Sequence, residues 1–442
     1  MNYFIKNDLL PAIPLTVVNK KKSPVLIHNN YPVWCVTNKT GVLLTPFFDG
    51  THTLKEASEF MAGQYHISYS KAADDIEQFL SAMNEAGFLK KPLKRDQITG
   101  INALFLHLTN QCNLSCRHCY VASGPDKVEA LDADFVKTVL KRFHGAGGTQ
   151  VTFSGGEPLL WPEFETTLDL AASLGLHIQV LTNGTLINKE WVQKFKDLNI
   201  SIQVSLDGWS REIHEVIRGR GTFDRTLSAL KDLSDYGISG KQLSVSTMIT
   251  HLIASDPEKI VQKVAPFNPG LVRFLPLRLT GRACSSKELK GLSPEEMMKF
   301  LILADKTRQK WHDTITVTTG ITGEGIDNFE RPWCPVGQQL VVNTDAKVYP
   351  CVLMMSEEFC VGDLFKQDLT DIVSSSSMIK IVNAIHERVD VIEACQKCVW
   401  RGFCQAGCAG ISCSVGGSLD ARDGLCSWRK KWYKKTFKAV AE

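Results

Sequence analysis

The chain has 442 residues, of which 44% are hydrophobic and 22% are charged, and its formal net charge at pH 7 is +3. This composition supports sizeable hydrophobic cores, the length suggests roughly three domains, and so small a charge predicts neither a nucleic-acid partner nor a membrane partner. No apolar run approaches the roughly 18 residues of a membrane span. Lys6 and Asp8 interrupt the apolar N-terminus, so we do not expect a signal peptide. The sequence therefore predicts a cytoplasmic protein, in which disulfides are rare.

Residues 1–95 predict a first domain. The runs "PVLIHN" and "PVWCVTN" favour a hairpin, and helical patterns follow at 40–50, 53–65 and 70–89. Thr53 and Glu56 have the spacing of a capping box at the start of the second helix. Strands followed by three helices predict a small winged-helix-like module. The charged segment "KKPLKRDQITG" predicts a linker behind it.

Residues 100–320 predict a second domain in which strands and helices alternate. Candidate strands lie at 103–108, 150–154, 177–182, 201–206, 243–248 and 271–276. The fold class is therefore α/β, and six strand–helix units fit an open, partial (β/α)6 barrel better than a closed eightfold one. Functional groups are expected at the carboxyl ends of the strands. Residues 109–119, "SGGEP", "TNGT" and "SLDG" lie at those ends.

Residues 330–442 predict a third domain, rich in cysteine and poor in long regular elements, which bound metal would have to organise. The closing stretch "WRKKWYKKTFK" carries six Lys and Arg residues, and we expect it to form a solvated helical tail without a nucleic-acid partner.

The 14 cysteines are unevenly placed. Three lie within 112–119, eight lie between 334 and 413, one is Cys426, and only Cys35 and Cys284 fall elsewhere. Clustered cysteines in a cytoplasmic chain indicate metal ligands, whereas Cys35 and Cys284 are most simply buried small hydrophobes.

The first cysteine group is Cys112, Cys116 and Cys119, spaced C-x3-C-x2-C within "TNQCNLSCRHCYVAS". Tetrahedral zinc and cubane iron–sulfur sites normally take four ligands, so three thiolates leave one position open for a cofactor or a substrate. Zinc would need a further ligand such as His118, which lies between two of the cysteines and reaches the metal poorly. We expect His118 to pack beside the site.

This cysteine spacing after the first barrel strand, followed by "GGEP", resembles the radical S-adenosylmethionine (SAM) superfamily. The resemblance implies a [4Fe–4S] cluster held by Cys112, Cys116 and Cys119. In that family the free iron binds the amino and carboxylate groups of S-adenosylmethionine, and one electron then breaks a carbon–sulfur bond to give a 5′-deoxyadenosyl radical. Such chemistry requires a strongly reducing partner, such as flavodoxin or ferredoxin, because cluster potentials reach down to about −700 mV.

The same resemblance predicts which residues contact S-adenosylmethionine. The backbone of Ser154, Gly155, Gly156 and Glu157 would contact its amino group. Polar groups at later strand ends would contact its carboxylate or ribose, and these are Asn183, Ser205, Asp207 and Arg218. Local structure explains several of these residues equally well, because Gly-Gly permits a tight strand-to-helix turn, Asn-Gly and Asp-Gly form turns, and a lone arginine often forms a surface ion pair.

The second cysteine region, "CQKCVWRGFCQAGC" with Cys426 beyond it and Cys334 to Cys351 upstream, resembles the SPASM extension of radical SAM enzymes. The resemblance implies two auxiliary [4Fe–4S] clusters and so three clusters in all. The outer cluster would be held by Cys395, Cys398, Cys404 and Cys426, and the inner one by Cys334, Cys351 and Cys408. Zinc remains an alternative, although zinc ribbons separate their cysteine pairs further.

This chain departs from the SPASM pattern in two ways. Ala346 stands where a glycine usually occurs in the turn before Cys351. No further cysteine precedes Cys334, so the inner cluster either has an open iron or takes a ligand from Cys360 or Cys413.

The N-terminal 95 residues resemble the PqqD-like element that recognises leader peptides in maturases of ribosomally made peptides. A leader would add a strand to the edge near residues 33–38. The alternative is a generic helical cap on the barrel.

We therefore expect an enzyme that crosslinks a precursor peptide through a radical, most simply with a cysteine thioether of sactipeptide or ranthipeptide type. Carbon–carbon crosslinking, sulfatase or quinone-cofactor maturation and a non-catalytic scaffold are the alternatives.

Overall fold

The structure, a computed structural model, describes residues 9–19, 23–89, 100–320, 334 and 336–440. The predicted linker at 90–99 lies outside these residues. The N-terminal unit is a three-stranded antiparallel sheet in the order β1-β2-β3, followed by helices. Its elements are β1 (Leu15–Val18), β2 (Val25–His28), β3 (Trp34–Val36), α1 (Lys39–Leu44), η1 (Thr45–Phe47), α2 (Leu54–Tyr65) and α3 (Tyr69–Glu85). The predicted hairpin and three helices are confirmed, and β1 was not predicted.

Local sequence explains where these helices begin and what they bury. The Thr53 hydroxyl accepts a hydrogen bond from the backbone N–H of Glu56 at 3.1 Å, and Glu56 Oε2 accepts one from the backbone N–H of Thr53 at 2.7 Å. This is the predicted capping box. One face of α3 carries Ala72, Ile76, Leu80 and Met83, all of them buried in a core shared with β2. The N-terminal unit therefore has a core of its own.

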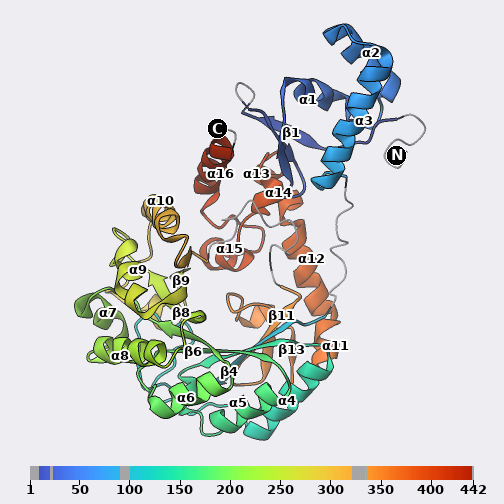
Figure 1. Cartoon of the computed structure of the whole chain (residues 1–442). Coiled ribbons are helices and arrows are strands. Elements are labelled where there is room, and N and C mark those ends of the chain that lie inside the picture. The colour runs from blue at the N-terminus through green and yellow to red at the C-terminus, as the bar shows by residue number, and fades with distance from the viewer. Residues whose placement is uncertain (1–8, 20–22, 90–99, 321–333, 335, 441–442) are drawn as a thin grey trace.

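The barrel is part of a ten-stranded sheet in the order β10-β9-β8-β7-β6-β5-β4-β11-β12-β13 (Figure 1). All six predicted strands are present and parallel: β4 (Ala103–Thr109), β5 (Gln150–Gly155), β6 (His177–Thr182), β7 (Ser201–Ser205), β8 (Gly240–Ile249) and β9 (Pro269–Pro276). A further parallel strand, β10 (Thr316–Thr318), follows β9. The sheet has two ends in the described residues, so the barrel is open as predicted.

Helices cover the outside of the curved sheet (Figure 1). They are α4 (Ala133–Gly145), α5 (Phe164–Ser173), α6 (Lys189–Asp197), α7 (Arg211–Arg218), α8 (Thr222–Asp235), α9 (Glu258–Val264) and α10 (Pro294–Trp311), with short η2 (Pro158–Leu160), η3 (Ala265–Phe267) and η4 (Gly281–Cys284) between them. Each longer helix buries one stripe, as α4 does with Val136, Val139, Leu140 and Phe143. This outer packing leaves the inner face of the sheet for polar side chains.

The C-terminal region continues the barrel sheet, because β11 (Gln339–Val342) pairs in parallel with β4. The remaining elements are β12 (Lys347–Tyr349), η5 (Glu357–Phe359), β13 (Gly362–Asp363), α11 (Leu369–Val373), α12 (Ser376–Val391), α13 (Glu393–Gln396), α14 (Arg401–Cys404), α15 (Ala409–Gly416) and α16 (Cys426–Val440). The expectation of few long elements was wrong: α12 has 16 residues and α16 has 15. Both helices have an apolar stripe that packs on neighbouring elements.

The basic tail is helical as predicted and its lysines are exposed, but one face of the helix is buried, which was not predicted. Within α16, Tyr433 and Phe437 are 0% and 1% exposed, because they pack with Val25 and Ile27 of β2 and with Trp400. Asn19 also donates a hydrogen bond to the carbonyl oxygen of Phe437 at 2.7 Å. Figure 1 shows the N-terminal sheet beside α16 and above α13 and α14. The tail is therefore the contact that joins the first unit to the last.

No helix among the described residues combines the length and the apolar character that crossing a membrane requires.

Candidate active site

The loop after β4 brings the first three cysteines together. Cys112 and Cys116 are 7% and 8% exposed and pack around Leu114, with the partly buried Cys119 against them. Backbone bonds anchor the loop, as the N–H of Cys112 donates to the carbonyl of Gly124 at 3.0 Å. All 14 thiols are free. Burial raises the pKa of Cys112 to about 12, so a metal that binds here must displace the proton.

Gly155 and Gly156 lie against the root of this loop. Gly155 has φ +121°, and a Cβ there would lie 2.4 Å from the carbonyl oxygen of Thr109. A Cβ on Gly156 would lie 2.0 Å from the carbonyl oxygen of Gln111. The N–H groups of Gly156 and Glu157 already donate to those same two carbonyls, at 2.6 and 2.9 Å. Both glycines are therefore needed for close packing of two strand ends.

Glu157 is completely buried and directed at the end of β6. Its Oε1 accepts a hydrogen bond from the Thr182 hydroxyl at 2.8 Å, and its Oε2 accepts one from the backbone N–H of Asn183 at 2.9 Å. Burial raises its pKa to about 7. The Asn183 amide in turn donates to Asn113 of the cysteine loop at 2.9 Å. Glu157 thus aligns the ends of β5 and β6, and Asn183 links β6 to the loop.

Asp207, Arg218 and His118 form a buried group beside Cys116. Asp207 Oδ2 accepts hydrogen bonds from His118 Nε2 at 2.7 Å and from Arg218 Nε at 2.5 Å, and its Oδ1 accepts one from the backbone N–H of Met248. Burial raises the pKa of Asp207, but Arg218 and His118 lower it well below its usual range. Because both its carboxylate oxygens have protein partners, Asp207 is placed to orient Arg218. His118 packs beside the cysteines as expected.

These groups surround a cavity of about 530 Å³ inside the barrel mouth. The three cysteines, Ser154, Gly155, Gly156, Asn183, Ser205, Asp207 and Arg218 all line it, whereas Glu157 does not. Ser205 lies within 3.5 Å of Ser246 on the next strand. The structure therefore brings every predicted cofactor contact except Glu157 to one cavity.

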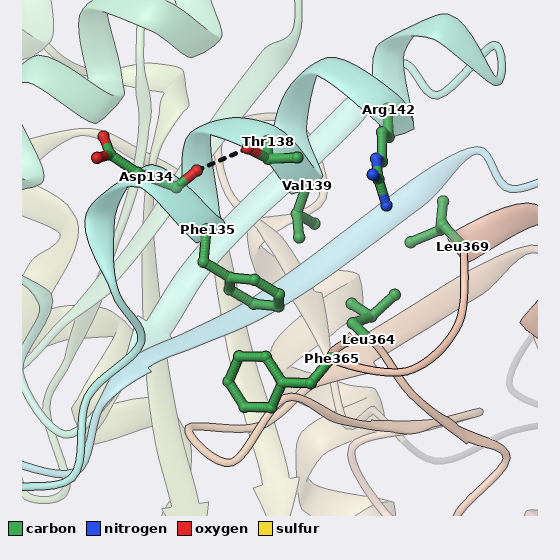
Figure 2. Close-up of a pocket in the computed structure, with 8 residues that line it drawn as sticks. All are labelled: Asp134, Phe135, Thr138, Val139, Arg142, Leu364, Phe365 and Leu369. Atoms are coloured by element: carbon green, nitrogen blue, oxygen red, sulfur yellow. Dashed lines mark hydrogen bonds between the residues drawn. The ribbon is translucent and has the colours of Figure 1, made fainter.

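A second hollow, of about 420 Å³, lies on the outside of the barrel between α4 and the segment after β13 (Figure 2). Phe135 and Phe365 face one another there with ring centroids 4.8 Å apart, and Arg142 pairs with Asp368 at its edge. No cysteine lines this hollow. It therefore shares none of the chemistry of the barrel cavity.

Several of the later cysteines lie near enough to affect one another's pKa. Burial, with smaller contributions from the neighbouring thiols of Cys351 and Cys408, raises the pKa of Cys334 to about 12. Likewise burial raises the pKa of Cys404 to about 11, with added effects from Cys395 and Cys426. Burial also raises the pKa of Cys395, and the thiols of Cys426 and Cys398 add to this effect.

Two parts of the chain match models of known families. Residues 106–264 match the radical SAM superfamily, and residues 334–399 match SPASM, an iron–sulfur cluster-binding domain. The chain is a radical SAM enzyme with a SPASM domain. The residues present fit the iron–sulfur cluster that this family binds, since three free thiols lie together at the edge of the cavity.

Two Bacillus subtilis (strain 168) proteins are similar to this enzyme in sequence. The sporulation killing factor maturation protein SkfB is 29% identical over 322 residues, which cover 70% of this chain and 76% of SkfB. The antilisterial bacteriocin subtilosin biosynthesis protein AlbA is 26% identical over 330 residues, which cover 73% of this chain and 70% of AlbA.

Two solved structures share the fold. The structure of anSMEcpe with bound AdoMet and the Cp18Cys peptide has a TM-score of 0.64 at 21% identity and covers 77% of this chain and 98% of its own. Streptococcus suis SuiB bound to precursor peptide SuiA has a TM-score of 0.60 at 13% identity and covers 94% of this chain and 99% of its own. The second likeness takes in nearly the whole radical SAM enzyme.

Several cavity residues of the radical SAM enzyme were not predicted. The Tyr120 hydroxyl bonds His107 Nε2 at 3.0 Å, and the Arg278 guanidinium stacks 4.4 Å from the Tyr120 ring centroid. Arg282 donates to the carbonyl of Cys116 at 2.9 Å, and Arg273 lines the cavity from β9. The available signal was the presence of arginines in "LVRFLPLRLTGR", where an apolar barrel strand was expected.

Ala346 and the remaining cysteines test three further sequence predictions. Ala346 is fully buried with φ +59°, so it occupies the left-handed turn that favours glycine. Cys413 lies near Cys408, whereas the Cys360 thiol faces the carbonyl of Gly362 at 3.4 Å. Cys284 follows an exposed turn, is itself exposed, and donates a hydrogen bond to the carbonyl of Leu279, so its predicted burial was wrong. Cys35 is partly buried in the N-terminal core.

Proposed function

We propose that this radical SAM enzyme modifies a ribosomally made precursor peptide and installs a crosslink, most simply a cysteine thioether. The observation that carries the proposal is the grouping of Cys112, Cys116 and Cys119 at the mouth of a cavity large enough for a cofactor and a side chain. The printed names of SkfB and AlbA describe maturation and biosynthesis of peptides, and the anSMEcpe and SuiB structures each hold a peptide. These relatives support a peptide substrate.

The cofactor site follows from the cavity lining. Cys112, Cys116 and Cys119 would hold a [4Fe–4S] cluster, which with S-adenosylmethionine supplies the 5′-deoxyadenosyl radical. The N–H groups of Gly156 and Glu157 are already bonded, so carbonyl oxygens along Ser154–Gly156 are left to accept hydrogen bonds from the methionine ammonium group. Arg218 and Ser205 would hold the carboxylate and the ribose. Asp207 and Glu157 would act by holding Arg218 and Asn183 in place.

The SPASM thiols support the thioether in particular. Cys395, Cys398, Cys404 and Cys426 would hold an outer auxiliary cluster with four ligands. The inner set offers Cys334, Cys351 and Cys408, which leaves one position for a thiol from a substrate cysteine or for Cys413. Replacing Cys413 by alanine and counting iron separates these cases: loss of about four irons per chain means that Cys413 closes the site. Cys360→Ala is the matched control.

The N-terminal unit would hold the leader peptide. β3 is the terminal strand of its sheet, and Val36 on it is 49% exposed. An extended leader would pair with this edge, as peptides do in strand-addition complexes. The contact of β2 with Tyr433 and Phe437 fixes the unit to the SPASM domain, so a bound leader keeps its core segment near the cavity. A flavodoxin or ferredoxin would supply electrons.

The test is anaerobic reconstitution with iron, sulfide, S-adenosylmethionine and a reductant. We expect 5′-deoxyadenosine from the wild type and none from Cys112→Ala, Cys116→Ala or Cys119→Ala, each of which keeps its SPASM iron. Co-expression with a short cysteine-bearing precursor encoded near the gene should give a product lacking one pair of hydrogens per crosslink by mass spectrometry. A triple alanine variant that still converts the precursor would refute the proposal.

A further inference from the structure

An arginine in the barrel wall faces the cavity without a partner among the described residues. Arg273 lies on β9, in register with Ser246 on β8 and Thr318 on β10, and it lines the cavity. Burial lowers its pKa, and no nearby carboxylate opposes that effect. A guanidinium stays charged in proteins, and a buried cation costs free energy unless an anion or several acceptors meet it.

The other arginines of the cavity have partners. Arg218 pairs with Asp207, Arg282 bonds the carbonyl of Cys116, and Arg278 bonds the carbonyl of Val352 and stacks on Tyr120. Among the described residues, four guanidinium groups thus line the cavity, and Asp207, the single carboxylate of that described lining, belongs to Arg218. Burial raises the pKa of Cys116, and Arg218 and Arg282 both lower it, so these two cations serve the cysteine loop.

Among the described residues, no hydrogen bond or ion pair joins Arg273 to that loop. The predicted cofactor contacts lie at or after the ends of β4, β5, β6 and β7, and β9 follows β7 by two strands. Neighbouring strands lie about 4.8 Å apart, which puts Arg273 about 10 Å from β7 along the sheet. It therefore lies on a part of the cavity wall that carries none of the predicted cofactor contacts.

We propose that Arg273, assisted by Arg278, binds a carboxylate of the substrate, so that the segment entering the cavity carries an Asp or Glu close to the residue that is modified. This inference rests on the proposed function and adds to it the chemical class of the core peptide. A guanidinium can bind a carboxylate through two parallel hydrogen bonds, which gives both affinity and orientation. Such a contact would hold the acidic residue while its neighbour faces the radical.

The test uses two synthetic peptides, acetyl-Gly-Ala-Cys-Ala-Asp-Ala-Gly-amide and the same peptide with Asn in place of Asp. Binding to the reconstituted enzyme with S-adenosylmethionine is measured by calorimetry. We expect the wild type to bind the Asp peptide about tenfold more tightly or better. Arg273→Met should remove the preference, Arg273→Lys should keep part of it, and the surface control Arg211→Gln should keep all of it.

A second measurement tests whether Arg273 instead binds the carboxylate of S-adenosylmethionine. S-adenosylmethionine alone is titrated into wild type and Arg273→Met, whose iron content and thermal unfolding are checked first. We expect its affinity to change less than about twofold. A wild type that binds both peptides equally or not at all overturns the inference, and so does an Arg273→Met variant that loses S-adenosylmethionine instead. Failure of the wild type to form 5′-deoxyadenosine would instead count against the proposed function.

Discussion

Gly156 lies so close to Gln111 that a Cβ on Gly156 would be 2.0 Å from the Gln111 carbonyl oxygen. The obstacle is backbone, which cannot move aside as a flexible side chain can. We predict that Gly156→Ala displaces the loop of Cys112 and lowers the iron content by about four atoms per chain. The measurement is iron per chain after anaerobic reconstitution. Gly145→Ala, where nothing lies within 4 Å of the new Cβ, should keep full iron; equal iron in both variants would contradict the prediction.

Arg388 joins the loops of the SPASM domain. It is fully buried, and its guanidinium donates to the carbonyls of Leu419, Gly407, Ala406 and Ala421 and to the hydroxyl of Ser412, at 2.6 to 3.1 Å. We predict that Arg388→Gln lowers the free energy of unfolding by at least about 3 kcal/mol, because several buried oxygens lose charged donors.

Thermal unfolding and iron content measure this effect, and the iron lost should be SPASM iron. Arg142→Gln serves as the control, because Arg142 forms an exposed pair with Asp368, and such pairs contribute little. If both variants unfold at the wild-type temperature, Arg388 does not hold these loops.

His28 makes the N-terminal sheet sensitive to acid. It is 3% exposed, its Nδ1 accepts a hydrogen bond from the backbone N–H of Asn30 at 3.1 Å, and burial lowers its pKa to about 4. The unfolded state, with a pKa of about 6.5, therefore binds more protons between these two values. Stability should be full above about pH 6.5 and should fall by up to about 3 kcal/mol as the pH drops toward 4.

Hydrogen exchange of β2 in the full chain, measured at pH 7 and pH 5, tests this dependence after correction for the intrinsic exchange rate. His28→Gln should flatten the dependence. An unchanged slope in that variant would place the sensitive group elsewhere.

Phe437 joins the N-terminal sheet to the SPASM domain, with its ring centroid 5.5 Å from that of Trp34 and 5.4 Å from that of Trp400. Phe437→Ala should cost about 3–5 kcal/mol at this contact. We predict faster proteolysis of the N-terminal unit and poorer conversion of a full precursor, with 5′-deoxyadenosine formation unchanged. Loss of 5′-deoxyadenosine as well would show that the contact also supports the barrel. Phe365→Ala, at a 64% exposed ring, is the control.

The sequence by itself determined the features that depend on residues close in the chain. Strand and helix periods located the six barrel strands, and Thr53 and Glu56 marked a helix start. The position of Ala346 was also recognisable, because a turn of that shape depends on its own backbone.

Only the tertiary structure decided which distant groups meet. Both oxygens of Asp207 turned out to have protein partners, Glu157 turned toward β6, and the basic α16 became a buried contact through Tyr433. Arg273 has no partner among the residues that the structure describes, which the sequence alone could not show. Burial and pairing depend on contacts between segments far apart in sequence, and neither period nor spacing encodes these contacts.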